Sequence, residues 1–281
     1  MSAAEAWICP TCGERVTTPF CPHCGESPLQ PPDLTLRGLS AHLLHAETSI
    51  DGRLLRTMWC LIRHPGMLTV AHMNGQRKPY IAPFQLFPLA NVIFFAMQSL
   101  TGTQIFGSSL ESHLHHQDWS AFAQSLVSER LAKTQTSLVV YAPVFDRAAV
   151  LNAKSLIILM VFPFALLLSL MFLRSRTPFI TCVYFSLHLY TFLLLLFSLA
   201  LLAAALDVLS GGRGLESPRI DTILSVINLV ICGAYTFNAA RPVFGASGPG
   251  RLAKAVALAL AAGAIVLGYR FAIFMITSYW T

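Results

Sequence analysis

Four cysteines in two matched pairs stand near the start of the chain, in the stretch CPTCGERVTTPFCPHCG that covers residues 9 to 25. Each pair reads Cys-Pro-x-Cys-Gly, with Cys9 and Cys12 in the first and Cys21 and Cys24 in the second. Two residues between thiols allow one tight turn to direct both sulfurs at one point, because proline pre-sets the turn and glycine accepts the positive φ that follows. The pattern predicts four thiolate ligands in a tetrahedral array, which suits a closed, structural Zn²⁺ site.

Other chemistries for these cysteines are a redox pair and an iron centre. A thioredoxin-like redox site needs a Cys-x-x-Cys within a βαβ unit, which the surrounding sequence does not suggest. Haem attachment needs histidine directly after the second cysteine, where glycine stands. Iron takes the same thiolate set, and His23 is a conceivable substitute for one thiol. We predict a zinc ribbon over residues 1–30, too small to bury a core, whose metal supplies its folding free energy.

The composition of the rest of the chain is that of a membrane protein. Of the 281 residues, 55% are hydrophobic and 11% are charged, against about 25% charged in soluble domains. The positive charge of +6 does not gather on the ribbon, so we expect no nucleic-acid partner. No signal peptide is recognised ahead of the cysteines, so we expect a cytosolic N-terminus, where thiols stay reduced.

The apolar blocks predict an all-α polytopic membrane protein with about five transmembrane helices. Residues 31–80 are predicted as a linker with cytosolic or interfacial helices, and residues 81–281 as the transmembrane domain, with an extracytoplasmic loop at about 102–152. Trp119, Phe122, Ala123, Leu126 and Val127 keep helical spacing within that loop. Pro163 predicts a kink in the second span. The predicted spans are about 82–101, 154–173, 178–207, 220–239 and 253–277.

Residues 49–63 have the pattern of an amphipathic helix ahead of the first span. Arginines (Arg53, Arg56 and Arg63) fall on one side, and apolar residues (Leu54, Met58, Leu61 and Ile62) fall opposite. With Arg77 and Lys78 they form a predicted interfacial basic group, which favours a helix lying on an anionic leaflet. The alternative is a helix packed on the ribbon.

The distribution of lysine and arginine indicates the orientation. With the N-terminus inside, twelve of the nineteen fall in cytoplasmic segments, six fall outside and one, Arg270, lies in the fifth span. The positive-inside rule therefore predicts a cytosolic ribbon and an external C-terminus.

Two ionisable side chains fall within predicted spans. His188 lies near the middle of the third span and Arg270 lies toward the outer end of the fifth. Such residues are functional candidates because they are costly in hydrocarbon. The alternatives are a neutral, hydrogen-bonded imidazole for His188 and a side chain extending to the surface for Arg270. We identified no carboxylate partner for either within the spans. The stretch HLHHQD (113–118) could hold a metal, but is interpreted as a solvated turn.

The order of three blocks, CPTCG…FCPHCG, then RHPGMLTVAHMNGQRKPYIAPFQLF, then VYFSLHLYTFLLL, resembles the bacterial domain of unknown function 3667 family. The resemblance covers most of the chain up to about residue 200. It implies a bacterial inner-membrane protein with zinc on the four cysteines, and it implies no activity. Two positions depart from the family pattern: Glu26 stands where glutamine is frequent, and Tyr190 where a second histidine often follows the one matched by His188.

Three functions were weighed. The first is a non-enzymatic interaction, assembly or regulatory protein of the membrane, with a possible protein partner at the zinc ribbon. The second is a small-solute or ion transporter or channel that uses His188 and Arg270. The third is a lipid-active enzyme, which is disfavoured because no nucleophile–base pair or open metal site was identified.

Overall fold

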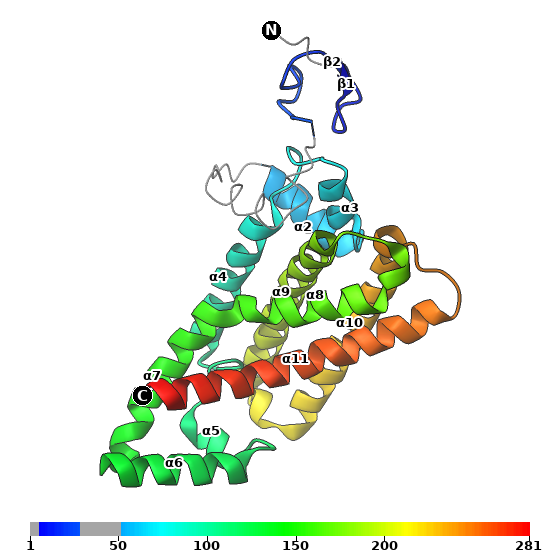
Figure 1. Ribbon diagram of the computed structural model, residues 1–281. Coiled ribbons are helices and arrows are strands. Elements are labelled where there is room, and N and C mark those ends of the chain that lie inside the picture. The colour runs from blue at the N-terminus through cyan, green and yellow to red at the C-terminus, as the bar shows by residue number, and fades with distance from the viewer. Residues whose placement is uncertain (1–5, 29–51) are drawn as a thin grey trace.

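The computed structural model describes residues 6–28 and 52–281, so residues 31–51 of the predicted linker lie outside the described residues. Two short strands, β1 (Trp7–Ile8) and β2 (Arg15–Val16), pair antiparallel with Trp7 opposite Val16. They form the hairpin of the cysteine module, which lies at one end of a long helical bundle (Figure 1).

Five helical segments within residues 52–281 are long and apolar enough to cross a membrane, which confirms the predicted all-α, five-span architecture. The first is α4 (Pro83–Thr101), and the third is α9 (Phe179–Leu209). The fourth lies in α10 (Pro218–Phe244), and the fifth is α11 (Gly250–Trp280). Two short 3₁₀ turns lie in the connections, η3 (Leu173–Ser175) before α9 and η4 (Gly214–Glu216) before α10.

The second span begins earlier than the sequence predicted. It runs from Leu138 to Met171, whereas we expected a start near residue 154 and a loop over 102–152. The polar residue that argued against a helix in this region is Asp146, and its Oδ1 accepts the backbone N–H of Leu110 at 2.7 Å. Because Asp146 is used in this contact, its presence is compatible with a helix that is otherwise apolar.

This second span is divided where a proline was expected to disturb it. It consists of α7 (Leu138–Leu156), the 3₁₀ turn η2 (Ile157–Met160) and α8 (Val161–Met171). Pro163 has no N–H to give to the preceding turn, and the tighter 3₁₀ geometry occurs just ahead of it. The chain changes direction between α7 and α8 (Figure 1).

Four shorter helices complete the fold. α2 (Arg53–Arg63) and α3 (Met67–Met73) precede the first span, while α5 (Leu110–His115) and α6 (Ser120–Thr134) follow it. The predicted helical spacing of residues 119–127 is confirmed by α6, which buries Ala123 and Val127. In α2 the buried residues are Thr57, Cys60 and Leu61, so Ile62, which we had placed on the apolar face with Leu61, is instead exposed.

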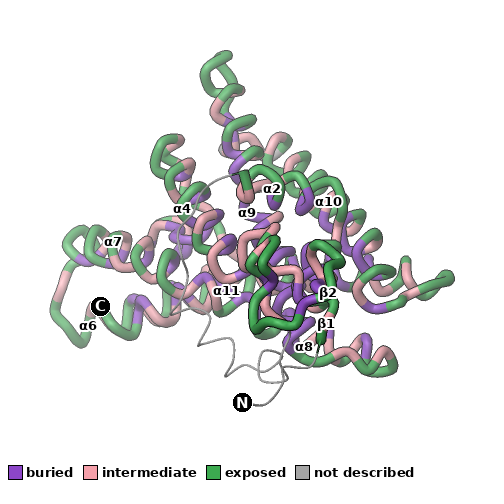
Figure 2. Tube along the Cα trace, turned by 90° about the horizontal axis from the view of Figure 1, so that it is seen from above, coloured by how far each residue is buried: buried purple, intermediate pink, exposed green. Residues whose placement is uncertain are grey.

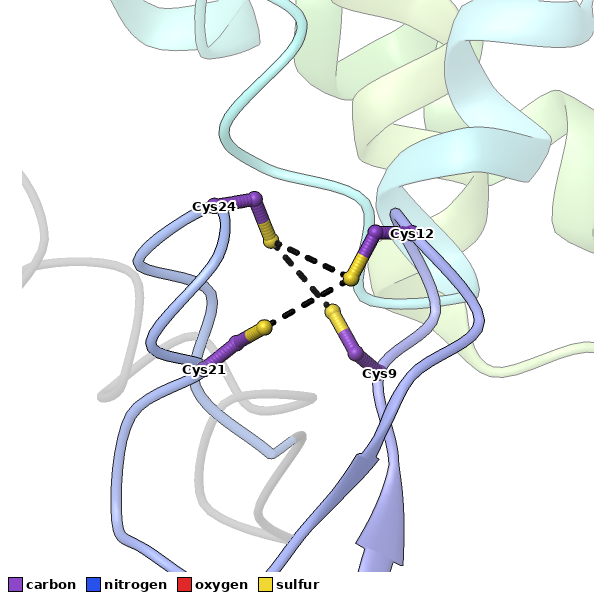
Figure 3. Close-up of side chains that lie close together, drawn as sticks. All are labelled: Cys9, Cys12, Cys21 and Cys24. Atoms are coloured by element: carbon purple, nitrogen blue, oxygen red, sulfur yellow. Dashed lines mark hydrogen bonds between the residues drawn. The ribbon is translucent and has the colours of Figure 1, made fainter.

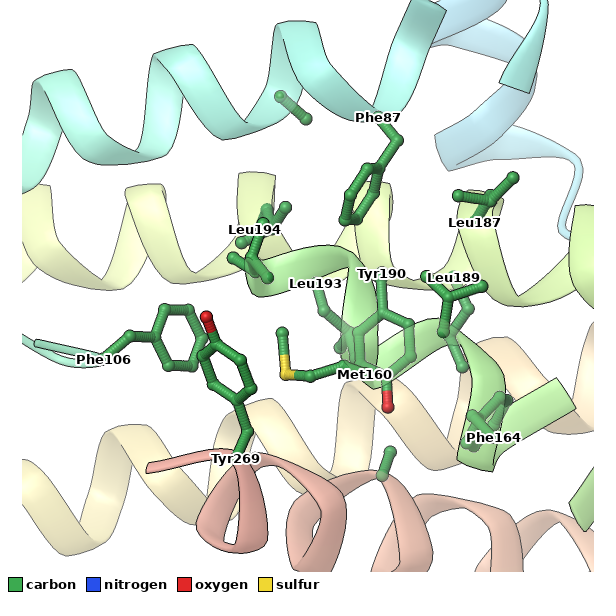
Figure 4. Close-up of a cluster of buried hydrophobic side chains, with 14 of the residues drawn as sticks. Phe87, Phe106, Met160, Phe164, Leu187, Leu189, Tyr190, Leu193, Leu194 and Tyr269 are labelled. Atoms are coloured by element: carbon green, nitrogen blue, oxygen red, sulfur yellow. The ribbon is translucent and has the colours of Figure 1, made fainter. Parts of the chain in front are cut away.

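Helix α9 lies at the centre of the bundle. Residues 180–191 are buried on every side, because α4 and α8 pack along α9 while α3 and α10 close the remaining faces. Aromatic and leucine side chains from several helices interdigitate there, with Phe87, Phe164 and Tyr190 among them (Figure 4). The outer sides of the helices are largely exposed (Figure 2), and many of the exposed residues on the spans are leucine, isoleucine or valine. An apolar surface of this extent is typical of a membrane-facing bundle.

Candidate metal centre

The two cysteine turns have the same backbone structure. The N–H of Cys9 donates to the carbonyl of Glu14 at 2.8 Å, and the N–H of Cys21 donates to the carbonyl of Glu26 at 2.7 Å. The glycines that close the turns adopt the positive φ predicted from the sequence, +77° at Gly13 and +72° at Gly25. The repeated pattern means that each turn directs two thiols toward the other turn.

The four sulfur atoms converge on one point (Figure 3). All four lie within 4.8 Å of one another, and the separations are 3.4 Å for Cys9–Cys24, 3.5 Å for Cys12–Cys21 and 3.9 Å for Cys12–Cys24. A tetrahedral ion with metal–sulfur distances near 2.3 Å would separate its ligand atoms by about 3.8 Å. The cluster therefore has the size of a four-thiolate metal site, and its sulfurs are too far apart to be disulfide-bonded. His23 is exposed and is not part of the cluster.

The protonation behaviour of the thiols also favours a cation. Burial raises the pKa of Cys9, but backbone N–H groups of Cys12 and Thr11 and the neighbouring thiols outweigh it and lower the pKa to about 7. Burial together with the neighbouring sulfurs raises the pKa of Cys24 to about 12. One thiolate forms easily and further ones are opposed, so four thiolates require a metal ion to neutralise them. Zinc and iron both accept such a set.

The ribbon is fastened to the helical bundle by Glu26. This carboxylate is buried, and its Oε2 accepts three hydrogen bonds: from Thr11 Oγ1 at 2.9 Å and from the backbone N–H groups of Arg77 and Lys78, each at 3.0 Å. The side-chain amide of Gln76 adds a fourth bond by donating to the carbonyl of Pro10 at 2.8 Å. One carboxylate thus joins the two cysteine turns to each other and both to the α3–α4 loop.

Sequence reasoning did not assign this role to Glu26, which we had noted only as a departure from the family pattern. The glutamate directly follows a metal turn, and its own carbonyl closes that turn by accepting from Cys21. An acidic residue with this placement, together with a loop rich in backbone donors such as NGQRKPY, is the signal that could have indicated the contact.

His188 is fully buried, and its Nδ1 lies 2.9 Å from Thr69 Oγ1 in α3. A second imidazole, that of His72, lies beside it with ring centroids 5.7 Å apart. The Nδ1 of His72 must donate to the carbonyl of Leu68 at 2.9 Å, because a carbonyl only accepts, and burial lowers the pKa of His72 to about 4. The hydrogen-bonded, uncharged arrangement that was the alternative for His188 is therefore what its contacts resemble.

The second histidine near His188 therefore comes from α3 and not from position 190. Tyr190 packs edge-on against Phe164, with ring centroids 5.7 Å apart, in the apolar core. His72 was missed because a single histidine in a short helix carries no periodic signal. Only the packing of α3 on α9 brings it to His188.

Arg270 lies toward the opposite end of the bundle. Its Nη2 donates to Ser108 Oγ at 3.0 Å, in the loop after α4, whereas His188 contacts Thr69, which precedes α4. Arg270 lines a cavity of about 350 Å³ together with Asp221 and Asn228. Asp221 is a carboxylate that the sequence analysis had not connected with Arg270. The structure does not bring His188 and Arg270 together.

The predicted interfacial basic residues separate into two groups. Arg53, Arg56 and Arg63 lie on α2, while Arg77 and Lys78 lie in the loop that binds Glu26.

The stretch 113–118 differs from the predicted solvated turn at one residue. His115 and His116 are exposed, but His113 is buried, accepts from Trp119 Nε1 at 3.2 Å and lies 4.8 Å from the ring of Phe274. The apolar environment supplied by α11 explains the burial. Within residues 6–28 and 52–281, the cysteine cluster is the only group of three or more potential metal ligands.

Comparison with known proteins places the chain in a family. Residues 51–95, which cover α2, α3 and most of α4, match the family model described as "Protein of unknown function (DUF3667)". No curated protein and no solved structure matches the chain. The matched segment contains the α3–α4 loop that receives Glu26, and this agrees with the resemblance found in the sequence. The chain belongs to the DUF3667 family.

Proposed function

We propose that this protein is a non-enzymatic component of a bacterial inner membrane, in which a zinc-loaded ribbon acts as an assembly or regulatory element at the cytosolic end of the bundle. The observation that carries the proposal is the contact of Glu26. The carbonyl of this residue belongs to a metal turn, and its carboxylate binds the loop between α3 and α4. Metal loading of the ribbon is therefore coupled to the structure of the loop that opens the membrane domain.

Zinc is the metal we propose for Cys9, Cys12, Cys21 and Cys24. The sulfur separations match a closed tetrahedral site, and zinc in such a site contributes folding free energy without redox chemistry. A ribbon that is rigid only when loaded presents a fixed surface to another protein. Two apolar side chains are available on that surface, because Ile8 is 72% exposed and Phe20 is 64% exposed.

The orientation of the proposal rests on charge. Two of the six cations that we had counted outside the membrane, Arg147 and Lys154, fall within the second span once it begins at Leu138. The remaining asymmetry is larger than the sequence alone suggested, which supports a cytosolic ribbon. Protease treatment of right-side-out and inverted vesicles provides the test. Cleavage of the ribbon in right-side-out vesicles would contradict this orientation.

The partner surface is tested with capture experiments on the full-length protein from membranes. We expect the double variant Ile8→Asp, Phe20→Asp to lose its bound partner while keeping its zinc. Thr17→Asp is the matched control, because Thr17 is an exposed residue of the same hairpin. If the captured proteins are the same for the double variant and the control, the docking role of the ribbon is wrong.

The alternative function is a small-solute or ion transporter. The cavity beside Arg270, with Asp221 and Asn228 in its wall, favours it. Against it stands the separation of His188 and Arg270, since they contact residues before and after α4, respectively. Uptake of a solute by proteoliposomes that is lost in Arg270→Gln would favour the transporter over the docking role.

A further inference from the structure

Helix α2 has three distinct sides. Thr57, Cys60 and Leu61 face the bundle and are buried. A second side carries Leu55, Trp59 and Ile62, which follow helical spacing and are 77%, 65% and 59% exposed. Large apolar side chains on one exposed stripe require a cover. The third side, next to the apolar stripe, carries Arg56 and Arg63.

The location of α2 places this stripe beside the membrane. α2 and α3 pack against α9, whose 31 residues extend for about 46 Å at 1.5 Å per residue. That length exceeds the hydrocarbon core of a bilayer, about 30 Å thick, so an end of α9 reaches the headgroup layer. The contacts of α2 and α3 are with the buried first part of α9, near the start of α4 (Figure 1). The outer side of α2 consequently faces the boundary between lipid and water.

The charges around α2 have one sign. Residues 52–110 contain no aspartate or glutamate, and Arg53, Arg56, Arg63, Arg77 and Lys78 all fall within this range. Within the described residues, neither Arg56 nor Arg63 forms an ion pair, and Arg63 lies 5.9 Å from the ring centre of Trp59. These cations therefore stay available to an anion at the surface.

A groove at the end of α2 joins the cationic and apolar sides. It has a volume of about 570 Å³ and is lined by residues of the α2–α3 turn and one residue of α10: Ile62, Arg63, His64, Pro65, Met67 and Asn238. The lining contains a guanidinium and an amide as phosphate donors, no carboxylate, and apolar walls that suit the start of an acyl chain.

We propose that α2 lies in the headgroup layer of an anionic leaflet and binds an anionic phospholipid in this groove. Leu55, Trp59 and Ile62 insert among the acyl chains, and Arg63 and Asn238 hold the lipid phosphate. The exposed stripe alone would suit other covers, but its combination with unpaired arginines and a position at the end of the spans matches a lipid headgroup.

The first test measures lipid retention. The full-length protein is reconstituted in nanodiscs that contain phosphatidylcholine and about 30% phosphatidylglycerol, extracted in mild detergent, and its bound phosphatidylglycerol is quantified. Because a surface cation contributes about 1 kcal/mol to anionic-lipid attraction, we expect about a fivefold loss of bound phosphatidylglycerol in Arg63→Gln and little loss in Arg63→Lys. Arg174→Gln is the control, because Arg174 is an exposed arginine outside α2 and the groove. Equal losses in Arg63→Gln and Arg174→Gln, or no loss in either, overturn the groove as a binding site.

The second test locates Trp59. Its fluorescence is taken as the difference between the wild-type protein and Trp59→Phe, in nanodiscs whose lipids carry brominated acyl chains. We expect strong quenching by the brominated lipid and weak quenching by aqueous iodide. Quenching by iodide alone places the stripe in water, and shielding from both quenchers shows that a protein covers it. Either result overturns the proposal.

Discussion

Replacing Glu26 by alanine should release the ribbon from the bundle while leaving the metal site intact. The substitution removes the acceptor of three hydrogen bonds, two of which come from the backbone N–H groups of Arg77 and Lys78. Hydrogen bonds to a charged acceptor contribute about 1.5–3 kcal/mol each. Counting two bonds at the lower value, because one oxygen has two lone pairs, gives about 3 kcal/mol, or about a 100-fold shift toward the undocked ribbon.

The assay is amide hydrogen exchange on the zinc-loaded, full-length protein in nanodiscs. We expect the amides of Arg77 and Lys78 to exchange about 100-fold faster in Glu26→Ala, and by a smaller factor in Glu26→Gln, which keeps a neutral acceptor. Glu14→Ala is the matched control, because Glu14 occupies the corresponding position after the first turn but is exposed. Zinc content should be unchanged in all three variants. Exchange at these amides within threefold of wild type in Glu26→Ala would refute the docking role of the carboxylate.

Three further predictions concern the turn after α2, the metal and the solution pH. Gly66→Ala should lower stability by about 2–4 kcal/mol, because Gly66 has φ +85° and an added Cβ would lie 2.8 Å from a side chain of α10; thermal melting should show a smaller loss in Gly102→Ala, where φ is also positive but the space is open. Chelation of the metal should unfold residues 6–28 and leave the helical circular dichroism nearly unchanged; a metal-free ribbon that stays folded would contradict this. Burial lowers the pKa of His113 to about 4, below its ordinary value, so the unfolded chain binds more protons in acid. Stability should therefore be complete above about pH 6.5 and fall as the pH drops toward 4, and His113→Gln should flatten this dependence of the melting temperature.

Local patterns in the sequence predicted the spans and the metal turns well. Uninterrupted apolar blocks determine where a helix can be buried in lipid, and four of the five spans begin within a few residues of the prediction. Cys-Pro-x-Cys-Gly determines its own turn, since the proline and the glycine each restrict or permit a backbone angle within that turn. The second span was predicted to start too late because Asp146 looked incompatible with a helix at a membrane. Its acceptor contact with Leu110 comes from another segment and cannot be seen in local composition.

The sequence by itself determined that this chain is a helical membrane protein with a four-cysteine site, because hydropathy and turn chemistry act over a few neighbouring residues. Only the tertiary structure decided that Glu26 fastens the ribbon to the α3–α4 loop, that His72 joins His188, and that α2 turns Trp59 outward. Each of these depends on a partner that lies far away in the chain. The identity of such a partner is set by how the helices pack, and it leaves no periodic trace in the sequence around either residue.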